Sequence, residues 1–260
     1  MPADRLLIAV STIGDRIAHL VLPPATDGVD ILILLQAPPA HLADLLPEVT
    51  SGHRPDVRLV TLDSTGVAKS RNAALDLADA GHLLFADDDV ILDMAGVLRL
   101  HGHLGRTPGL DMIAGRLLGP QGPVRARGPH RLRLTNSAHI GTPQLMIRLH
   151  RIRARGIRFD TRFGLGEKHP LGDEFIFVSD ALKAGLTGLY LPVAVGLHPT
   201  PSSGINWSDA HLLPARAAAL NRVFGAFVLP FALAFAWRHR QRIGGLGGIA
   251  RFVAQSLRRP

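Results

Sequence analysis

Residues 82–93 read HLLFADDDVILD, and this stretch decides the fold that the sequence predicts. The short apolar run Leu83–Ala86 follows a turn-forming glycine, Gly81, which is typical of a buried parallel strand. Three aspartates, 87 to 89, stand at the end of that run. Their mutual repulsion has to be compensated by water, by arginine or by a divalent cation.

The first half of the chain alternates between strand-like and helix-like patterns. Strands are predicted at 5–12, 30–36, 57–63 and into the aspartates, with helical stretches at 14–22, 38–49 and 66–81 between them. This order predicts an α/β fold with a mainly parallel, Rossmann-like sheet flanked by helices. Ligands bind beyond the carboxyl ends of such strands. Thr12, Gln36, Asp63 and the aspartates occupy these ends, so we expect them to line one site.

The second half is less regular. We expect loop with short antiparallel strands at 117–137, a strand that turns helical at 142–160, and a glycine-rich loop at 161–172. A helix is predicted at 173–185, since it starts with two acids and ends at a glycine. A strand-rich stretch, 186–199, and a loop, 200–208, complete a first domain of residues 1–208.

Composition narrows the classes of partner. Of the 29 basic residues three are lysines, which leaves 26 arginines, and the net charge is +8. Arginine suits phosphate and anionic surfaces, whereas an aromatic content of 5% offers few platforms for stacking bases, so we expect no nucleic acid. The absence of cysteine excludes disulfides and cysteine nucleophiles and fits a reducing, cytoplasmic location. The N-terminal run LLIAV is too short for a signal peptide.

The aspartates suggest a metal site. Asp87 and Asp89 project to the same side of an extended chain and can approach one Mg²⁺ or Mn²⁺, while Asp88 points away or contacts a ribose hydroxyl. His198, at another predicted strand end, would add an imidazole. The alternatives are a solvated acidic turn and a structural histidine, but a triplet that closes an apolar strand in a basic protein favours the metal.

Charged residues at two predicted helix starts have alternative interpretations. Lys69 and Arg71 stand where the helix dipole prefers acids, which suggests a bound anion; an exposed helix face is the alternative. Capping explains one acid of the pair Asp173 and Glu174, but a carboxylate near the metal could instead act as general base.

The C-terminal segment, 209–260, is predicted to be a helical extension. Residues 223–237 are apolar without interruption and are followed by the basic run RHRQR. Fifteen residues with a central proline are short for a membrane span of ~20 residues. A helix in the membrane interface and a buried helix that closes the core explain the pattern equally well.

Two segments together resemble glycosyltransferase family 2. Residues 66–90, GVAKSRNAALDLADAGHLLFADDDV, resemble that family's small basic S-R-N helix and its strand ending in D-x-D. Residues 163–186, FGLGEKHPLGDEFIFVSDALKAGL, resemble its glycine-rich loop and the acidic pair that opens a helix. The alternating first half fits the GT-A nucleotide-sugar domain, so the pattern covers roughly residues 5–200.

The resemblance implies an inverting, metal-dependent transfer of a sugar from a nucleotide-diphosphate donor, by family habit a UDP-sugar, to a glycan or lipid-linked hydroxyl. By position, Thr12 and Gln36 would line the nucleotide pocket, and Asp63, Lys69 and Arg71 would lie near the base or diphosphate. Asp87 and Asp89 would hold Mn²⁺ or Mg²⁺, with His198 as a further ligand. The family's acidic pair is usually Glu-Asp, with the second acid as base. Here the order is reversed, so position favours Glu174 and leaves Asp173 open.

Two other functions remain. A sugar nucleotidyltransferase would use a glycine-rich loop after the first strand, but the loop here, STIGDR, has one glycine. A non-catalytic GT-A-like binding protein would attach through its basic surface, in keeping with peripheral membrane association at the inner face. The presence of Asp87, Asp89 and Glu174 argues against that second alternative.

Overall fold

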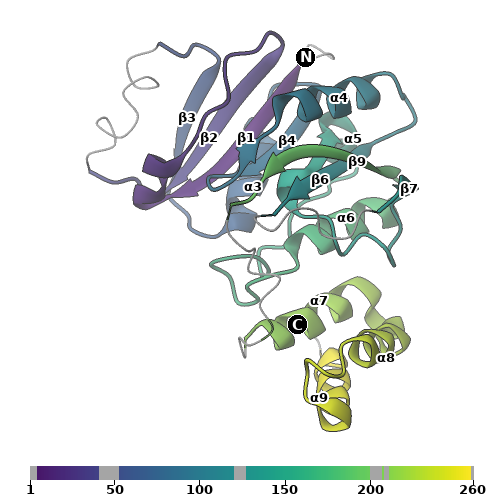
Figure 1. Ribbon diagram of the computed structural model, residues 1–260. Coiled ribbons are helices and arrows are strands. Elements are labelled where there is room, and N and C mark those ends of the chain that lie inside the picture. The colour runs from purple at the N-terminus through teal and green to yellow at the C-terminus, as the bar shows by residue number, and fades with distance from the viewer. Residues whose placement is uncertain (1–4, 41–52, 120–126, 200–206, 208–210, 259–260) are drawn as a thin grey trace.

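The computed structural model describes residues 5–40, 53–119, 127–199, 207 and 211–258, and within them nine strands form one sheet (Figure 1). The strand order is β3-β2-β1-β4-β8-β6-β9-β5, with β7 beside β9. The strands are β1 (Leu6–Ile13), β2 (Val29–Gln36), β3 (Val57–Leu62), β4 (His82–Asp87), β5 (Ile91–Leu92), β6 (Met112–Leu118), β7 (His130–Arg131), β8 (Leu145–Arg148) and β9 (Gly188–Leu197).

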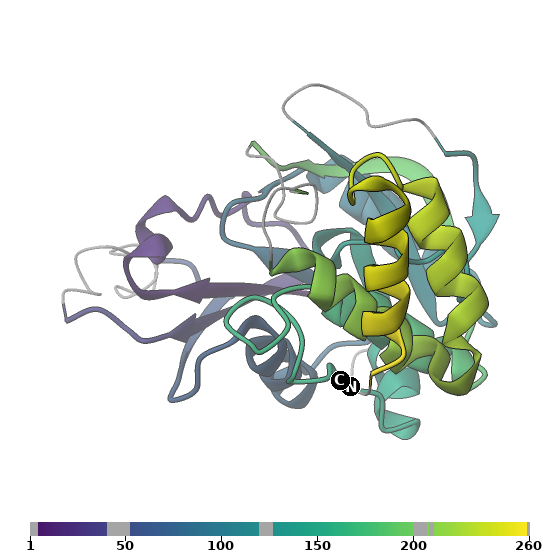
Figure 2. The same ribbon diagram turned by 90° about the horizontal axis from the view of Figure 1, so that it is seen from below.

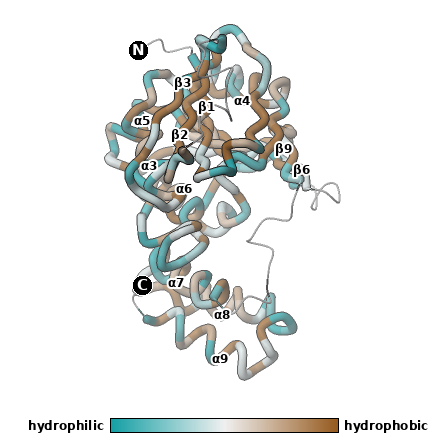
Figure 3. Tube along the Cα trace, turned by 90° about the vertical axis from the view of Figure 1, so that its left-hand side faces the viewer, coloured by the Kyte–Doolittle hydropathy of each residue, from teal (hydrophilic) through white to brown (hydrophobic). Residues whose placement is uncertain are grey.

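The N-terminal half of the sheet is parallel, as predicted. β1 lies between β2 and β4, and β3 follows at the edge, all in parallel register. Ser11 pairs with Asp87 and Ile13 with Gln36, so the carboxyl ends of these strands meet at one edge. β1, β2 and β4 are apolar over most of their length because both of their faces are buried (Figure 3), whereas the edge strand β3 exposes Arg58 and Thr61.

Two core clusters hold the layers together. On one face the sheet packs against α3 (Val67–Leu77), α5 (Leu149–Ala154) and α6 (Asp173–Lys183), and on the other against α4 (Met94–Gly105). α4 lies so close to β9 that a Cβ on Gly96 would stand 1.6 Å from the carbonyl oxygen of Ala194. A glycine is therefore required where that helix crosses the strand.

The second half of the sheet is mixed. β8 runs antiparallel between β4 and β6, and β9 pairs with β6 in parallel and with β5 and β7 antiparallel. Most paired positions lie in the parallel ladders, so the prediction of a mainly parallel α/β sheet is confirmed. The stretch 142–160 is a 3-10 turn (Thr142–Gln144) followed by β8 and α5, and the helical stretch at 14–22 is a short 3-10 helix, η1 (Gly14–His19). The helix predicted at 38–49 falls mostly on residues outside those described.

The C-terminal extension consists of α7 (Leu212–Phe224), the 3-10 turn η4 (Gly225–Phe227), α8 (Val228–Arg238) and α9 (Gly245–Ser256). These helices pack on one another and lie apart from the sheet, with α7 against α6 (Figures 1 and 2). Arg222 of α7 binds both Asp160 and Asp180, at 2.8 and 2.7 Å. The extension is thus attached to α6, which carries the acidic pair, and to Asp160 in the segment before it.

Candidate active site

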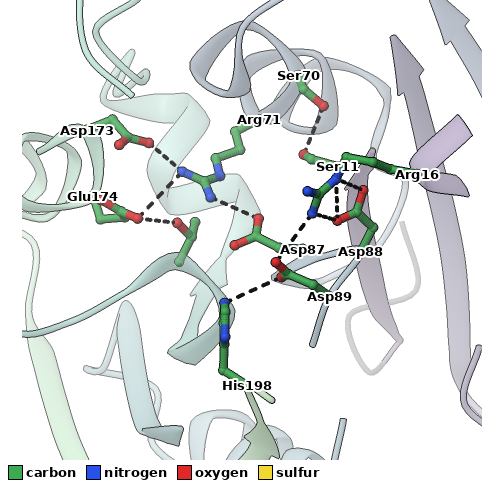
Figure 4. A network of polar contacts seen from close by, with 11 residues as sticks. Ser11, Arg16, Ser70, Arg71, Asp87, Asp88, Asp89, Asp173, Glu174 and His198 are labelled. Carbon is green, nitrogen blue, oxygen red and sulfur yellow. Dashed lines mark hydrogen bonds and ion pairs between the residues drawn. The ribbon is translucent and has the colours of Figure 1, made fainter. Parts of the chain in front are cut away.

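The candidate site lies at the carboxyl ends of β1 and β4, where the aspartates meet the starts of α3 and α6 (Figure 4). Asp87 is the last residue of β4, and a tight turn follows in which the Val90 amide donates to the Asp87 carbonyl at 3.2 Å. The turn sends the three carboxylates in different directions, and each has a different partner.

Asp88, the central aspartate, faces into the protein. Its side chain is 6% exposed and accepts hydrogen bonds from Thr12 Oγ1 at 2.6 Å and from Arg16 Nε at 3.0 Å. Arg16 contacts it with a second guanidinium nitrogen as well. Of the three compensations open to the triplet, arginine is therefore used here. Thr12 and Asp88, both predicted nucleotide contacts, are bonded to each other.

Asp87 is paired with Arg71, one turn into α3. The Arg71 guanidinium is buried, lies 3.0 Å from Asp87, contacts Asp173 directly and lies 3.7 Å from Glu174. Burial raises the pKa of Asp173 to about 7, Glu174 beside it acts in the same direction, and Arg71 opposes both. Burial likewise raises the pKa of Asp87 against the pull of Arg71. One arginine thus joins two acidic segments, at Asp87 and at Asp173, that are 86 residues apart in sequence (173 − 87).

Asp89 points toward His198. The carboxylate lies 3.5 Å from His198 Nε2 and 3.3 Å from Arg16. The His198 amide donates to the Leu118 carbonyl at 2.8 Å, which fixes the histidine at the end of β9. The fold therefore brings together Asp89 and His198, two predicted site residues that are distant along the chain.

A carboxylate and an imidazole form a donor set that suits Mn²⁺ or Mg²⁺ when substrate phosphates supply further oxygens. Asp89 and His198 fit such an ion. Within the described residues no group of three or more histidine, aspartate or glutamate side chains is arranged to hold a metal, and Asp87 is turned toward Arg71. Of the three predicted ligands, Asp89 and His198 thus form a close pair, and Asp87 lies nearby but is paired with Arg71.

The acidic pair opens α6 after Gly172, whose φ of 99° favours glycine. The two side chains differ in access: Asp173 is 3% exposed and held by Arg71, whereas Glu174 is 26% exposed and accepts a hydrogen bond of 2.9 Å from Thr142 Oγ1. Of the two, Glu174 is the one that a bound molecule can reach.

The remaining predicted residues surround the 64–66 loop. Gln36 Nε2 donates to the carbonyls of Ser64 and Gly66, at 2.7 and 3.2 Å, so its amide supports the loop. Lys69 donates to the Thr65 carbonyl and lies 3.2 Å from Glu167. Asp63 is exposed next to this loop.

Sequence reasoning missed two residues that contact the candidate site residues, Arg16 and Thr142. Arg16 had a signal, because it follows the first predicted strand, whose carboxyl end was expected to lie in one site with the aspartates. Thr142 had none, since only the tertiary fold brings it to Glu174.

The fold is similar to that of several solved structures. The mannosyltransferase PcManGT from Pyrobaculum calidifontis, in complex with GDP-Man and Mn²⁺, has a TM-score of 0.60 at 16% identity and covers 96% of this chain and 74% of its own. S. aureus TarS 1-349 in complex with UDP-GlcNAc has a TM-score of 0.57 at 16% identity, over 96% of this chain and 81% of its own. The chain spans 49% of the longer TarS structure.

These likenesses confirm the GT-A fold that the resemblance to glycosyltransferase family 2 implies. No family model matches the sequence, and no curated protein matches it either.

Proposed function

We propose that this protein is a glycosyltransferase that moves a sugar from a nucleotide-diphosphate donor to an acceptor hydroxyl, with inversion at the anomeric carbon. The observation that carries the proposal is the contact of Arg71 with both Asp87 and Asp173. It unites the strand end expected to face the diphosphate with the helix expected to carry the base. A transferase needs these two functions within one substrate length of each other.

Glu174 is our candidate for the general base. Its partly exposed carboxylate would take the proton of the acceptor hydroxyl as that oxygen forms a bond to the anomeric carbon. The bond from that carbon to the diphosphate breaks, and the nucleoside diphosphate leaves with the electron pair. Asp173, buried against Arg71, would position α6 instead.

We further propose that Asp89 and His198 hold a divalent cation, with Asp87 close by. When bound, the cation would neutralise charge on the departing diphosphate. Support comes from the 3.5 Å approach of the two side chains and from the Mn²⁺ in the PcManGT complex.

The donor is a nucleotide sugar, and a UDP-sugar is our first candidate. The similar structures are in complex with UDP-GlcNAc in one case and with GDP-Man in the other, so the nucleotide has to be measured. For the acceptor we propose a glycan or lipid-linked hydroxyl, used in the cytoplasm at the inner face of the membrane.

Titration calorimetry with UDP, GDP, CDP and dTDP, each with and without Mn²⁺, tests the site. We expect Mn²⁺-dependent binding of one nucleotide, its loss in Asp89→Ala, and its retention in Asp79→Ala, which removes an exposed aspartate beyond α3. Binding of none of the four contradicts the donor site. Release of pyrophosphate from a nucleoside triphosphate and a sugar phosphate would identify a sugar nucleotidyltransferase instead.

A further inference from the structure

The net positive charge of the protein belongs to its last fifty residues. Residues 211–260 contain eight of the 29 basic side chains, all of them arginines, and no acidic residue. The first 210 residues keep 21 basic against 21 acidic side chains and are neutral in sum. Five of the eight arginines are exposed on these helices or on the turns that follow them: Arg238, Arg240, Arg242, Arg251 and Arg258.

The same helices expose large apolar side chains. Leu229, Leu233 and Trp237 recur at four-residue spacing along α8 and share one face, with exposed fractions of 44%, 46% and 60%. Phe227 just before α8 and Leu246 at the start of α9 are both 77% exposed. Isolated exposed leucines are common, but a continuous apolar row marks an interaction site.

The row is the unpartnered side of a packed helix. α8 buries Val228, Ala232 and Ala236 against its neighbours and leaves Leu229, Leu233 and Trp237 outside. One side of the helix therefore closes a small core, as the buried-helix alternative expects, and the other side faces outward. The outward side has no charged residue before Arg238.

The basic residues begin where the apolar row ends. Trp237 is followed by Arg238, and the Arg240 guanidinium lies 4.9 Å from the Trp237 ring centre. A tryptophan at the border of an apolar face, with arginines beside it, matches the order of a bilayer surface, where acyl chains give way to headgroups. Charge therefore identifies the partner, because an acid-free basic surface complements an anionic one.

We propose that the outward face of α8, together with Phe227 and Leu246, docks on an anionic lipid bilayer, with the helix lying in the interface and the arginines on the headgroups. The docking surface is independent of the transferase activity because its residues lie outside the candidate active site. It would set the orientation of α6, to which α7 is joined through Arg222.

A transmembrane arrangement is the competing geometry. Leu212–Arg238 is long and apolar enough for a span by length and composition, although that is weak support. The chain turns at Gly225, where φ is 53°, and α7 is held on the GT-A domain by Arg222. In Figure 3, α8 and α9 lie beyond α7, on the side of the extension away from the sheet.

Vesicle co-sedimentation of the full chain tests the docking surface. Phosphatidylcholine vesicles with about a third phosphatidylglycerol should bind the protein, pure phosphatidylcholine should bind it less, and about 0.5 M salt should weaken binding. L229Q/L233Q should weaken binding about tenfold or more, because two apolar side chains leave the bilayer. R238Q/R240Q/R242Q should remove the preference for anionic vesicles.

Matched controls separate this face from general surface properties. V21Q changes an apolar side chain that is 59% exposed elsewhere, and R99Q changes an exposed arginine on α4; both should bind vesicles like the wild type. Thermal unfolding of each variant checks that it is folded. Unchanged binding in folded L229Q/L233Q overturns the proposal. So does a dimer that dissociates in that variant, or a vesicle-bound protein that resists alkaline extraction.

Discussion

Arg71 on α3 donates a hydrogen bond of 3.0 Å to Asp87 at the end of β4. The same guanidinium contacts Asp173 and lies 3.7 Å from Glu174, so a single buried cation faces three carboxylates. One guanidinium beside three carboxylates leaves an excess of negative charge in this cluster. A second positive charge at Asp87 and Asp89 would relieve it, which is one physical reason to expect a divalent ion there.

Loss of Arg71 should destabilise the protein strongly. In Arg71→Met the buried carboxylate of Asp173 and the partly buried carboxylate of Asp87 lose their cation, which costs about 3–5 kcal/mol of unfolding free energy. Urea denaturation measures the change. Arg158→Met is the matched control, because its pair with Asp76 is about half exposed on both sides and is worth about 1 kcal/mol or less. Equal losses in both variants would contradict the role given to Arg71.

Substitutions of the neighbouring aspartates Asp88 and Asp89 should have different effects, one on stability and the other on nucleotide binding. Asp88→Asn weakens the buried contacts with Thr12 and Arg16 and should lower the unfolding free energy by about 1–3 kcal/mol. Asp89→Asn, at a half-exposed carboxylate, should leave stability nearly unchanged and weaken Mn²⁺-dependent nucleotide binding about tenfold or more. Denaturation and calorimetry on both variants give the comparison. The reverse pattern would assign the cation to Asp88.

Substitutions of the two acids of α6 should also have different effects, one on kcat and the other on stability. Glu174→Gln keeps an oxygen that can accept from Thr142 but removes the base, so kcat should fall about 10²–10⁴-fold while donor affinity is retained. Asp173→Asn should mainly change stability, because its side chain faces Arg71. Steady-state kinetics with the donor found by calorimetry decide between them. A larger fall in kcat for a folded Asp173→Asn protein would make Asp173 the base.

Local patterns were sufficient to predict the parallel half of the sheet. The apolar runs of β1, β2 and β4 and the glycine before His82 predict the elements themselves and their parallel direction, but not the strand order, in which β4 lies beside β1 and not beside β3. The insertion of β8 between β4 and β6 is different, since it depends on which edge a later strand finds, and no local pattern encodes that choice.

The site divides in the same way. Position at a strand or helix end predicted that Asp87, Asp89, His198 and Glu174 would converge. It did not predict where each side chain points. Asp88 turns inward, where it pairs with Arg16. Arg71 reaches Asp173 rather than solvent because α3 and α6 contribute to the same core cluster. Such directions depend on contacts between segments far apart in sequence.

Part of the loss of stability in acid should be caused by a histidine outside the candidate active site. His82, the first residue of β4, is 1% exposed, and neither ring nitrogen has a hydrogen-bond partner among the described residues. Burial, with the nearby charges of His101 and Arg148, lowers its pKa from 6.5 to about 4. Between these two values the unfolded chain binds a proton that the folded protein does not, so the free energy of unfolding falls as the pH drops.

Replacing His82 by leucine should flatten that decline by about 3 kcal/mol at most between about pH 6.5 and about pH 4. Urea midpoints measured across this range give the slope. Half-buried His139, whose pKa is also lowered by burial to about 4, should keep a residual slope in the variant. His19→Gln, at an exposed histidine, should leave the slope as it is in the wild type. A His82→Leu protein that loses stability in acid as steeply as the wild type would mean that other groups take up the protons.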